Sequence, residues 1–353
     1  MITDQSDGIL SNCNFATLKL NYFLSNRPSI SDLKVHMNVA LNRLELAVTH
    51  YSEGICIYPI LEGGLLDDTN SHYISLPTDF IAFTEDNCLL LSMWGTRMSL
   101  YKYVRTEEES YHYGGRSRDM PMYIGRLALG NVAKYTEYVF HTYTSCNSEY
   151  DCVKRLNYPS LDGELKIGLG QMCRPWDVCA FNQMLMVTES MLHQDDTDHS
   201  TPWGLQLYHL PIQPLQLSTL TPFLTLGVVP SVKATQHLGK QLAPTRDIHS
   251  GPNYVTYAER LHTIFTSSQE NYTIGFHKLS TQKYSSGSNL VCSRSSYISL
   301  LPDEKNDLKL ATRVKPGPMA WDGHNNVLFV AAQHPDEPVV KRNCIYCFQP
   351  VFN

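Results

Sequence analysis

The segment Leu44-Glu45-Leu46-Ala47-Val48, followed after a polar gap by Ile55-Cys56-Ile57-Tyr58, is one copy of a pattern that recurs along this chain. Each copy has a short apolar run and then, after a polar gap, a second run built around an aromatic residue. The further copies join residues 88–91 to 98–101, 184–187 to 205–208, and 327–330 to 344–347. Two such runs across a turn are typical of a β-hairpin, and a unit that recurs every few tens of residues is typical of repeat architectures. The pattern therefore predicts a ring of small sheets.

The rest of the chain is consistent with an all-β fold. From Asp32 onward, short apolar runs alternate with Gly, Pro, Asn, Asp and Ser, which is the pattern of short strands and frequent turns. Isolated hairpins cannot bury both faces, whereas blades packed face to face around an axis can. We predict a degenerate β-propeller of six or seven blades over residues 32–353. Residues 39–48 are taken as a first strand, residues 222–229 as the candidate for a seventh blade, and residues 1–31 as a lead-in with a ring-closing strand near residues 17–24.

The composition argues against several classes of function. The chain has 353 residues, 42% of them hydrophobic and 18% charged, as expected for a folded protein. Its net charge of -6 offers no basic surplus for a nucleic-acid backbone. No apolar run reaches the roughly 18 residues of a membrane helix, and the polar, acidic residues 1–8 do not resemble a secretory signal. We expect no nucleic-acid partner, no membrane association and a cytoplasmic or nuclear protein.

The ten cysteines leave an extracellular alternative open. Most lie inside apolar runs, which favours reduced thiols that pack as small hydrophobic side chains. Cys146 with Cys152, and Cys173 with Cys179, are candidate loop disulfides if the protein is secreted. Cys344 and Cys347 form a Cys-x-x-Cys pair, but on one strand they point to opposite faces, which argues against a zinc ribbon.

Two Trp-Asp pairs resemble those of propeller repeats. Trp176-Asp177 and Trp321-Asp322 both precede an apolar strand. We interpret the tryptophans as packing residues and the aspartates as turn formers. The chain has no nucleophile elbow, phosphate loop or complete dinucleotide fingerprint. We therefore expect no catalytic residues, no cofactor and no enzymatic activity.

Two polar segments are candidates for partner-binding loops. The first runs from Glu107 to Arg116 and the second from His193 to His199. The second segment has the carboxylate and imidazole groups of a metal site, but it lacks the glycine that a calcium loop needs, so we interpret it as a solvated loop. The candidate residues are Glu107, Glu108, Glu109, Tyr111, Arg116, His193, Asp195, Asp196 and His199.

Three passages resemble the C-terminal, propeller-like region of a large F-box protein family of basidiomycete fungi. They are Leu76-Pro77-Thr78-Asp79-Phe80-Ile81 through Tyr103, Asp177 through Val187 with Leu205 to Pro211, and Pro318-Met319-Ala320-Trp321-Asp322 through Val330. The resemblance implies a β-propeller that recognises substrates for ubiquitin ligation. Residues 1–30 do not resemble the helical F-box that binds the ligase adaptor, so the family's adaptor-binding residues have no counterpart here.

These observations lead to one expected function and one alternative. The expected function is a non-enzymatic protein-interaction module, with substrate recognition for ubiquitin ligation as the form that the resemblance implies. The alternative is an extracellular propeller that binds or processes sugars, such as a lectin, a viral attachment head or a glycosidase. The sequon at Asn271-Tyr272-Thr273 and the cysteine pairs favour this alternative.

Overall fold

The structure is a computed structural model of the chain. It describes residues 15–38, 41–51, 53–83, 88–93, 97–105, 109–119, 124–133, 136–143, 150–158, 160–169, 172, 175–181, 184–189, 203–210, 222–229, 252–269, 271–284, 287–302, 308, 310, 312–338 and 342–352. This part of the chain contains 24 strands and one short 3-10 helix, η1 (Glu62–Gly64). The predicted all-β fold is confirmed.

The strands form six antiparallel sheets of four strands each in the described part of the chain. Two sheets contain β2 (Ile30–Asn38), β3 (Arg43–His50), β4 (Gly54–Pro59) and β5 (His72–Ile74), and β6 (Phe80–Phe83), β7 (Cys88–Met93), β8 (Arg97–Arg105) and β9 (Glu109–Asp119). The next two contain β10 (Ile124–Ala133), β11 (Thr136–Tyr143), β12 (Cys152–Asn157) and β13 (Leu165–Ile167), and β14 (Pro175–Phe181), β15 (Met184–Glu189), β16 (Trp203–His209) and β17 (Leu224–Val229). The last two contain β18 (Tyr254–Ala258), β19 (Thr263–Ser268), β20 (Thr273–Tyr284) and β21 (Gly287–Ser299), and β22 (Lys315–Asp322), β23 (Val327–Gln333), β24 (Asn343–Phe352) and β1 (Phe15–Arg27).

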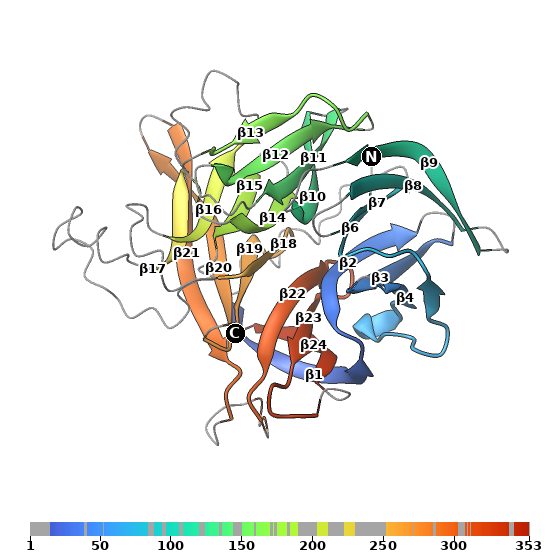
Figure 1. The fold of residues 1–353 in the computed structure, drawn as a ribbon. Helices are drawn as coiled ribbons and strands as arrows, with labels where there is room; N and C mark the ends of the chain where they lie inside the picture. Colours follow the sequence, from blue (N-terminus) through green and yellow to red (C-terminus); the bar gives the residue numbers. More distant parts are fainter. Residues whose placement is uncertain are drawn as a thin grey trace.

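The six sheets are arranged as a propeller (Figure 1). The first strand of each sheet contacts the first strands of the sheets on either side, in the order β2, β6, β10, β14, β18, β22 and back to β2. The first strands therefore surround a common axis, and the later strands of each sheet lie progressively further out. Each sheet therefore has one edge that faces the axis and one edge at the outside of the ring.

Two expectations about individual strands are wrong. Residues 39–48 were expected to hold the first strand of a copy, but they lie largely in β3, the second strand, and β2 precedes them. Residues 222–229 were the candidate for a seventh blade, but β17 pairs with β16 as the outer strand of an existing sheet. In both cases the position of the strand in its sheet depends on the strand with which it pairs. The pattern of apolar residues within one run does not show that partner.

The ring is closed by the two ends of the described chain. β1 pairs antiparallel with β24, with Lys19 opposite Gln349 and Tyr22 opposite Cys347. β1 includes the residues where the ring-closing strand was expected, and it shares its sheet with the three C-terminal strands. The division expected between residues 31 and 32 falls inside β2.

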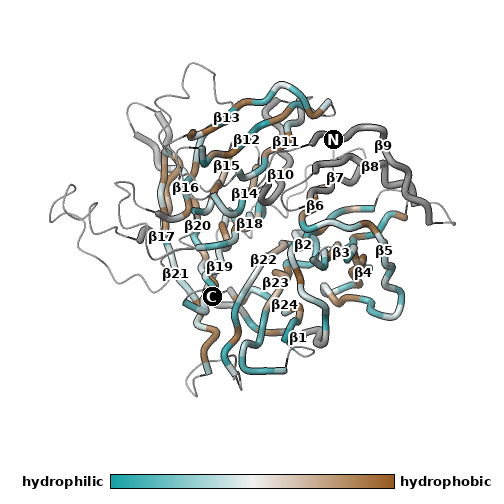
Figure 2. Tube along the Cα trace, in the orientation of Figure 1, coloured by the Kyte–Doolittle hydropathy of each residue, from teal (hydrophilic) through white to brown (hydrophobic). Residues whose placement is uncertain are grey.

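The hydrophobic core lies between neighbouring sheets. Leu46 and Val48 of β3 pack with residues of β23 and β24, whereas Ala47 packs toward Ile81 of the following sheet. A middle strand is thus buried on both faces, which explains its continuous apolar sequence. Each large side chain buried in this way stabilises the fold by about 1.5–3 kcal/mol. Hydrophobic residues recur along strands such as β4 and β24 (Figure 2).

The two cysteines of β24 show the same alternation. Cys344 belongs to the core between β18–β21 and the closing sheet, and Cys347 belongs to the core between the closing sheet and β2–β5. Both side chains are buried. The predicted divergence of these two side chains is confirmed.

Candidate functional site

The axis of the ring contains a cavity of about 220 Å³. The first strands of all six sheets line it through Leu33, Lys34, Val35, Ala82, Phe83, Ala128, Val178, Cys179, Ala180, Val255, Thr256, Met319, Ala320 and Trp321. Lys34 is the one charged side chain among these lining residues. The wall of the cavity is otherwise made of small, aliphatic and aromatic side chains.

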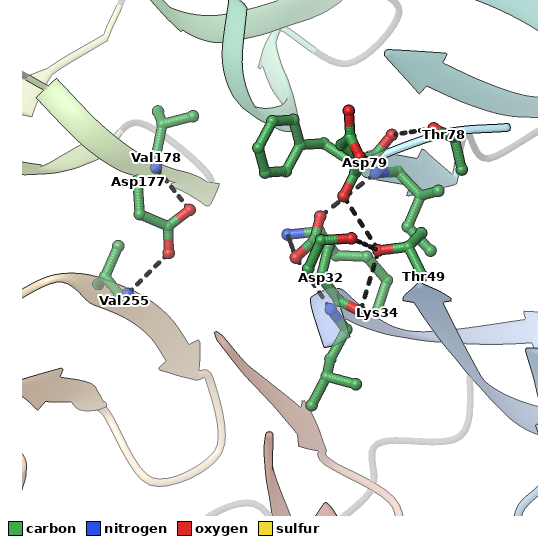
Figure 3. Close-up of polar contacts among 12 residues, drawn as sticks. Asp32, Lys34, Thr49, Thr78, Asp79, Asp177, Val178 and Val255 are labelled. Atoms are coloured by element: carbon green, nitrogen blue, oxygen red, sulfur yellow. Dashed lines mark hydrogen bonds and ion pairs between the residues drawn. The ribbon is translucent and has the colours of Figure 1, made fainter. Parts of the chain in front are cut away.

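Two buried aspartates next to this cavity join neighbouring sheets (Figure 3). Asp177 accepts hydrogen bonds of 2.9 Å from the backbone N–H groups of Val178, in its own strand, and Val255, in the next sheet. Asp32 accepts a bond of 2.9 Å from the N–H of Leu33 and one of 3.2 Å from the N–H of Ile81, again in the next sheet. The two carboxylates therefore occupy equivalent places and hold adjacent first strands together.

This finding corrects the interpretation of one Trp-Asp pair and agrees with the other. Asp177 is not a turn former, because it lies within β14 and its carboxylate binds a strand of the neighbouring sheet. Asp322 ends β22 and accepts hydrogen bonds from the backbone N–H groups of His324 and Asn325, as a turn-forming aspartate does. Trp321 stacks on Phe265 of β19 and lines the axial cavity.

Hydroxyl groups form a second series of bonds between the sheets. In four sheets, a Thr or Ser of the second strand donates to a backbone carbonyl at or just before the first strand of the next sheet. The bonds are Thr49 Oγ1 to Asp79 O (3.0 Å), Thr142 Oγ1 to Trp176 O (3.4 Å), Thr188 Oγ1 to Asn253 O (2.7 Å) and Ser267 Oγ to Gly317 O (2.8 Å). We call these bonds and the two aspartate bridges the inter-sheet latches.

The polar groups of the axis therefore have a structural role. Lys34 Nζ lies 3.7 Å from Asp32 Oδ1, so the positive charge of Lys34 is close to the negative charge of Asp32. Burial raises the pKa of the Cys179 thiol to about 11, against the smaller opposing effect of the Lys34 charge. This thiol is protonated at neutral pH and is a poor nucleophile. The carboxylates of Asp32 and Asp177 are the groups near the axis best suited to acid–base chemistry. Both accept hydrogen bonds from backbone N–H groups and so join neighbouring strands.

A buried carboxylate cluster lies at the far end of β2. The side chain of Glu45 is fully buried and accepts hydrogen bonds from Arg43 Nε (2.8 Å) and Asn38 Nδ2 (3.1 Å), with His36 Nε2 at 3.2 Å. Burial alone raises the pKa of Glu45, but the bonds from His36, Arg43 and Asn38 outweigh it and lower the pKa to about 2. His36 in turn stacks on Phe83 of the next sheet at 3.7 Å between ring centroids. Sequence reasoning missed this cluster, although an acidic residue between two leucines was a visible signal.

Four large apolar side chains are exposed beside this cluster, at the same end of the β2–β5 sheet. They are Met37, Leu41, Leu61 and Leu65, and each residue is 43–47% exposed. Met37 lies opposite Leu44 in the β2–β3 pair, and the carbonyl of Leu44 accepts a bond of 2.9 Å from the N–H of Ile60. The N–H of Leu61 then donates to the carbonyl of Leu65 at 2.7 Å. We call these four residues the rim patch.

The rim patch is anchored to the closing sheet. The N–H of Gly63 donates to Asn325 Oδ1 at 3.1 Å, in the turn between β22 and β23. Gly64 has a φ of +80°, and a Cβ atom there would collide with Val327. The segment that carries Leu61 and Leu65 is therefore held in one conformation against two sheets, which is what a preformed binding surface requires.

None of the partner-binding residues expected from the sequence is a member of the rim patch. Glu107, Glu108, His193, Asp195, Asp196 and His199 fall outside the described residues. Glu109, Tyr111 and Arg116 lie in β9, the outer strand of its sheet, and pair with Arg105, Tyr103 and Leu100 of β8. The expectation that they belong to a loop between blades is wrong, because β8 provides a strand partner for them.

The described residues contain neither a metal-binding cluster nor a membrane-spanning helix. No group of three or more His, Cys, Asp or Glu side chains in this part of the chain could hold a metal ion. Among the same residues, no helix has the length and apolar character needed to cross a lipid bilayer.

Comparison with known proteins finds similarity of fold alone. No family model and no curated protein matches the chain. The PQQ-bound aldose sugar dehydrogenase of Streptomyces coelicolor is 12% identical, with a TM-score of 0.54 over 96% of this chain and 100% of that one. A Trichoderma reesei carbohydrate-active enzyme of family AA12 is 10% identical, with a TM-score of 0.52 over 96% and 98%. The Myceliophteria thermophila Cps50 (Swd1) β-propeller domain is 10% identical, with a TM-score of 0.46 over 94% and 99%.

Proposed function

We propose that this chain is a non-enzymatic protein-interaction module that binds its partner through the rim patch. The observation that carries the proposal is the exposure of Met37, Leu41, Leu61 and Leu65 together at one end of one sheet. Large apolar side chains that gather on a surface mark interaction sites, because their exposure to water is unfavourable until a partner covers them. The fixed conformation of residues 61–65 supports the proposal, because this segment loses little conformational entropy when a partner binds.

The arrangement of the ring supports the same proposal. We propose that the six sheets are the six blades of one closed ring, joined by the inter-sheet latches. The buried carboxylates of Asp32 and Asp177 then serve the scaffold, and the rims of the ring are left for function. Segments at the rims are positioned by this scaffold and can carry a binding surface.

The resemblance to the F-box family gives the proposal a specific form. On this basis the rim patch recognises substrate proteins for ubiquitin ligation in the cytoplasm or nucleus. Residues 1–30 do not resemble an F-box, so the resemblance assigns no ligase-docking module to these residues. The partner's chemistry follows from the patch: an apolar segment that covers the four side chains.

The test is a comparison of partners captured by matched variants of the full chain. We would purify the wild type, the double variant Leu61→Gln/Leu65→Gln, and the control Leu169→Gln from native cells and quantify the bound proteins. Leu169 is exposed to a similar degree, 42%, but it follows β13, the outer strand of another sheet. We expect the main partner to be depleted at least ten-fold on the double variant, which corresponds to about 1.4 kcal/mol of lost binding energy, and retained on the control.

Two results would contradict the proposal in different ways. Equal recovery of all partners by the three proteins would exclude the rim patch as the binding surface. Recovery of a patch-dependent partner without any ubiquitin-ligase component would exclude the ligase form and retain the interaction module. Circular dichroism of each variant separates loss of binding from loss of fold.

A further inference from the structure

The outer strand β21 is unusually long and has an open edge. It extends over 13 residues, Gly287–Ser299, and ends the sheet order β18-β19-β20-β21. In the described part of the chain β21 pairs with β20 alone. None of the described strands pairs with its other edge. An edge of this kind is a template for a further strand.

The other outer strands have features that block such pairing. β5 and β13 have three residues each. β9 has four charged residues among its eleven, Glu109, Arg116, Arg118 and Asp119. β1 is as long as β21, but its pairing with β24 is interrupted by three register shifts. Short length, charge and irregular pairing are the devices by which proteins prevent edge-to-edge association.

β21 has few of these devices. Arg294 is the one charged residue among its 13, and the strand has no proline. Its pairing with β20 has a single register shift, at Lys278/Leu279. Two of the other outer strands, β5 and β17, contain no Asp, Glu, Lys or Arg, but they have only three and six residues. β21 is thus a long edge with a single charged residue and a single register shift.

Exposed apolar side chains accompany this edge. Tyr297 is 43% exposed within β21, and Leu301 is 41% exposed just beyond its end. Ser293, Arg294 and Ser295 are also exposed. Tyr297 and Leu301 are large apolar side chains whose contact with water is unfavourable. Their exposure therefore favours a complex in which another chain covers this edge.

We propose that β21 pairs with β21 of a second copy of this chain, so that two molecules form a two-fold symmetric dimer through one continuous sheet. A two-fold axis brings two identical strands together antiparallel, and each copy then supplies the complement of the other. With one charged residue per strand, like charges face each other only when the axis passes through Arg294. An axis through Ser293, for example, places Arg294 opposite Cys292.

The choice of a second copy over a foreign strand follows from the lack of protection against self-pairing. Every molecule carries the same edge, so any edge able to accept a foreign strand meets its own copy first unless charge, proline or irregular pairing prevents it. The interface uses the β18–β21 sheet, whereas the rim patch belongs to the β2–β5 sheet. Dimer formation and partner binding can therefore fail or succeed independently.

The test is the molar mass of the full chain in solution. Light scattering and sedimentation would be measured over a wide concentration range for the wild type, Ser296→Lys and Ser296→Thr. Lysine on an edge strand opposes pairing, whereas threonine retains a neutral side chain with good strand propensity. We expect the wild type and Ser296→Thr to have twice the chain mass, and Ser296→Lys to have the mass of one chain. Ser75→Lys, which adds the same charge beyond β5, should remain a dimer.

Hydrogen exchange of the wild type provides a test without substitution. Amides of residues 290–298 should exchange at least about ten-fold more slowly at a concentration where the dimer forms than at one where it dissociates. A wild type that stays monomeric at every concentration would overturn the proposal. A dimer that persists in Ser296→Lys, with no change of exchange in β21, would overturn it as well, because another surface would then hold the copies together.

Discussion

The carboxylate of Asp177 accepts a 2.9 Å hydrogen bond from the backbone N–H of Val255, which belongs to the first strand of the next sheet. Asp32 makes the equivalent bond to the N–H of Ile81 at 3.2 Å. Because both carboxylates are buried, each bond is stronger than it would be in water, and its loss leaves a polar group unpaired. The ring is therefore held by directional contacts near its axis as well as by the apolar cores between its sheets.

Substitution of Asp177 should weaken the whole ring. In Asp177→Ala the N–H groups of Val178 and Val255 lose their acceptor. Each buried group left unpaired costs roughly 1–3 kcal/mol, so the free energy of unfolding should fall by about 2–4 kcal/mol. Urea denaturation monitored by tryptophan fluorescence measures the change. The control Asp336→Ala removes an exposed ion pair with Arg313 and should cost less than about 1 kcal/mol. Equal losses in the two variants would show that Asp177 does not join the sheets.

The buried Glu45 cluster should make stability depend on pH in the acid range. The pKa of Glu45 is lowered to about 2 in the folded protein. A lowered pKa means that the contribution of Glu45 to stability is fully present above the pKa of the unfolded chain, near 4.3, and is lost as the pH falls toward 2. The difference amounts to about 3 kcal/mol.

Glu45→Gln isolates this contribution. The variant keeps the size of the side chain but does not titrate, so the stability difference between wild type and variant should shrink as the pH falls from about 4.5 to about 2. Chemical denaturation at a series of pH values measures it. A difference that stays constant over this range would mean that the carboxylate of Glu45 is not held by His36, Arg43 and Asn38 as described.

The two glycines of η1 offer a matched pair of variants. Gly63 and Gly64 have φ values of +75° and +80°, so an alanine at either is strained. A Cβ atom at Gly63 meets open space, whereas one at Gly64 collides with Val327. Gly63→Ala should therefore cost about 1 kcal/mol of unfolding free energy, and Gly64→Ala clearly more. Similar losses for both would show that η1 does not pack on β23.

The buried thiols should resist modification in the folded protein. Cys152, Cys344 and Cys347 are buried, and burial raises the pKa of both Cys152 and Cys344 to about 12. A thiol at neutral pH with such a pKa is protonated and unreactive. Mass spectrometry after alkylation should find these three cysteines unmodified in the native protein and modified after unfolding without reductant.

The same experiment bears on the extracellular alternative. Unfolding without reductant followed by alkylation counts the free thiols among all ten cysteines, and a reduced sample gives the full count. Mostly free thiols are the expected result for a cytoplasmic or nuclear protein. Several disulfides would instead favour the sugar-binding or sugar-active propeller.

The local pattern of the chain predicted its strands well and their partners poorly. Apolar runs such as residues 44–48 indicate a strand buried on both faces because side chains alternate between faces. The same rule placed Cys344 and Cys347 on opposite faces. It assigned β17 to an additional blade and the segment from Glu107 to Arg116 to a loop, because the pattern of one run does not show which strand pairs with it.

The candidate site shows the same division. The turn at Asp322 was predictable, since its acceptors and donors lie within three residues of one another. The bridge from Asp177 to Val255 was not, because the two residues are separated by 78 positions. The rim patch likewise unites Met37 with Leu61 and Leu65, which come together only when β2, β3 and β4 pair.

Side-chain alternation, turn residues and the spacing of apolar runs were enough to establish an all-β propeller, because each of these features acts between residues close in the chain. Which strand lies innermost, which carboxylates latch neighbouring sheets and which apolar side chains remain exposed follow from pairing and packing between distant residues. Those contacts form only when the sheets close into a ring, and they locate the surface that we propose for partner binding.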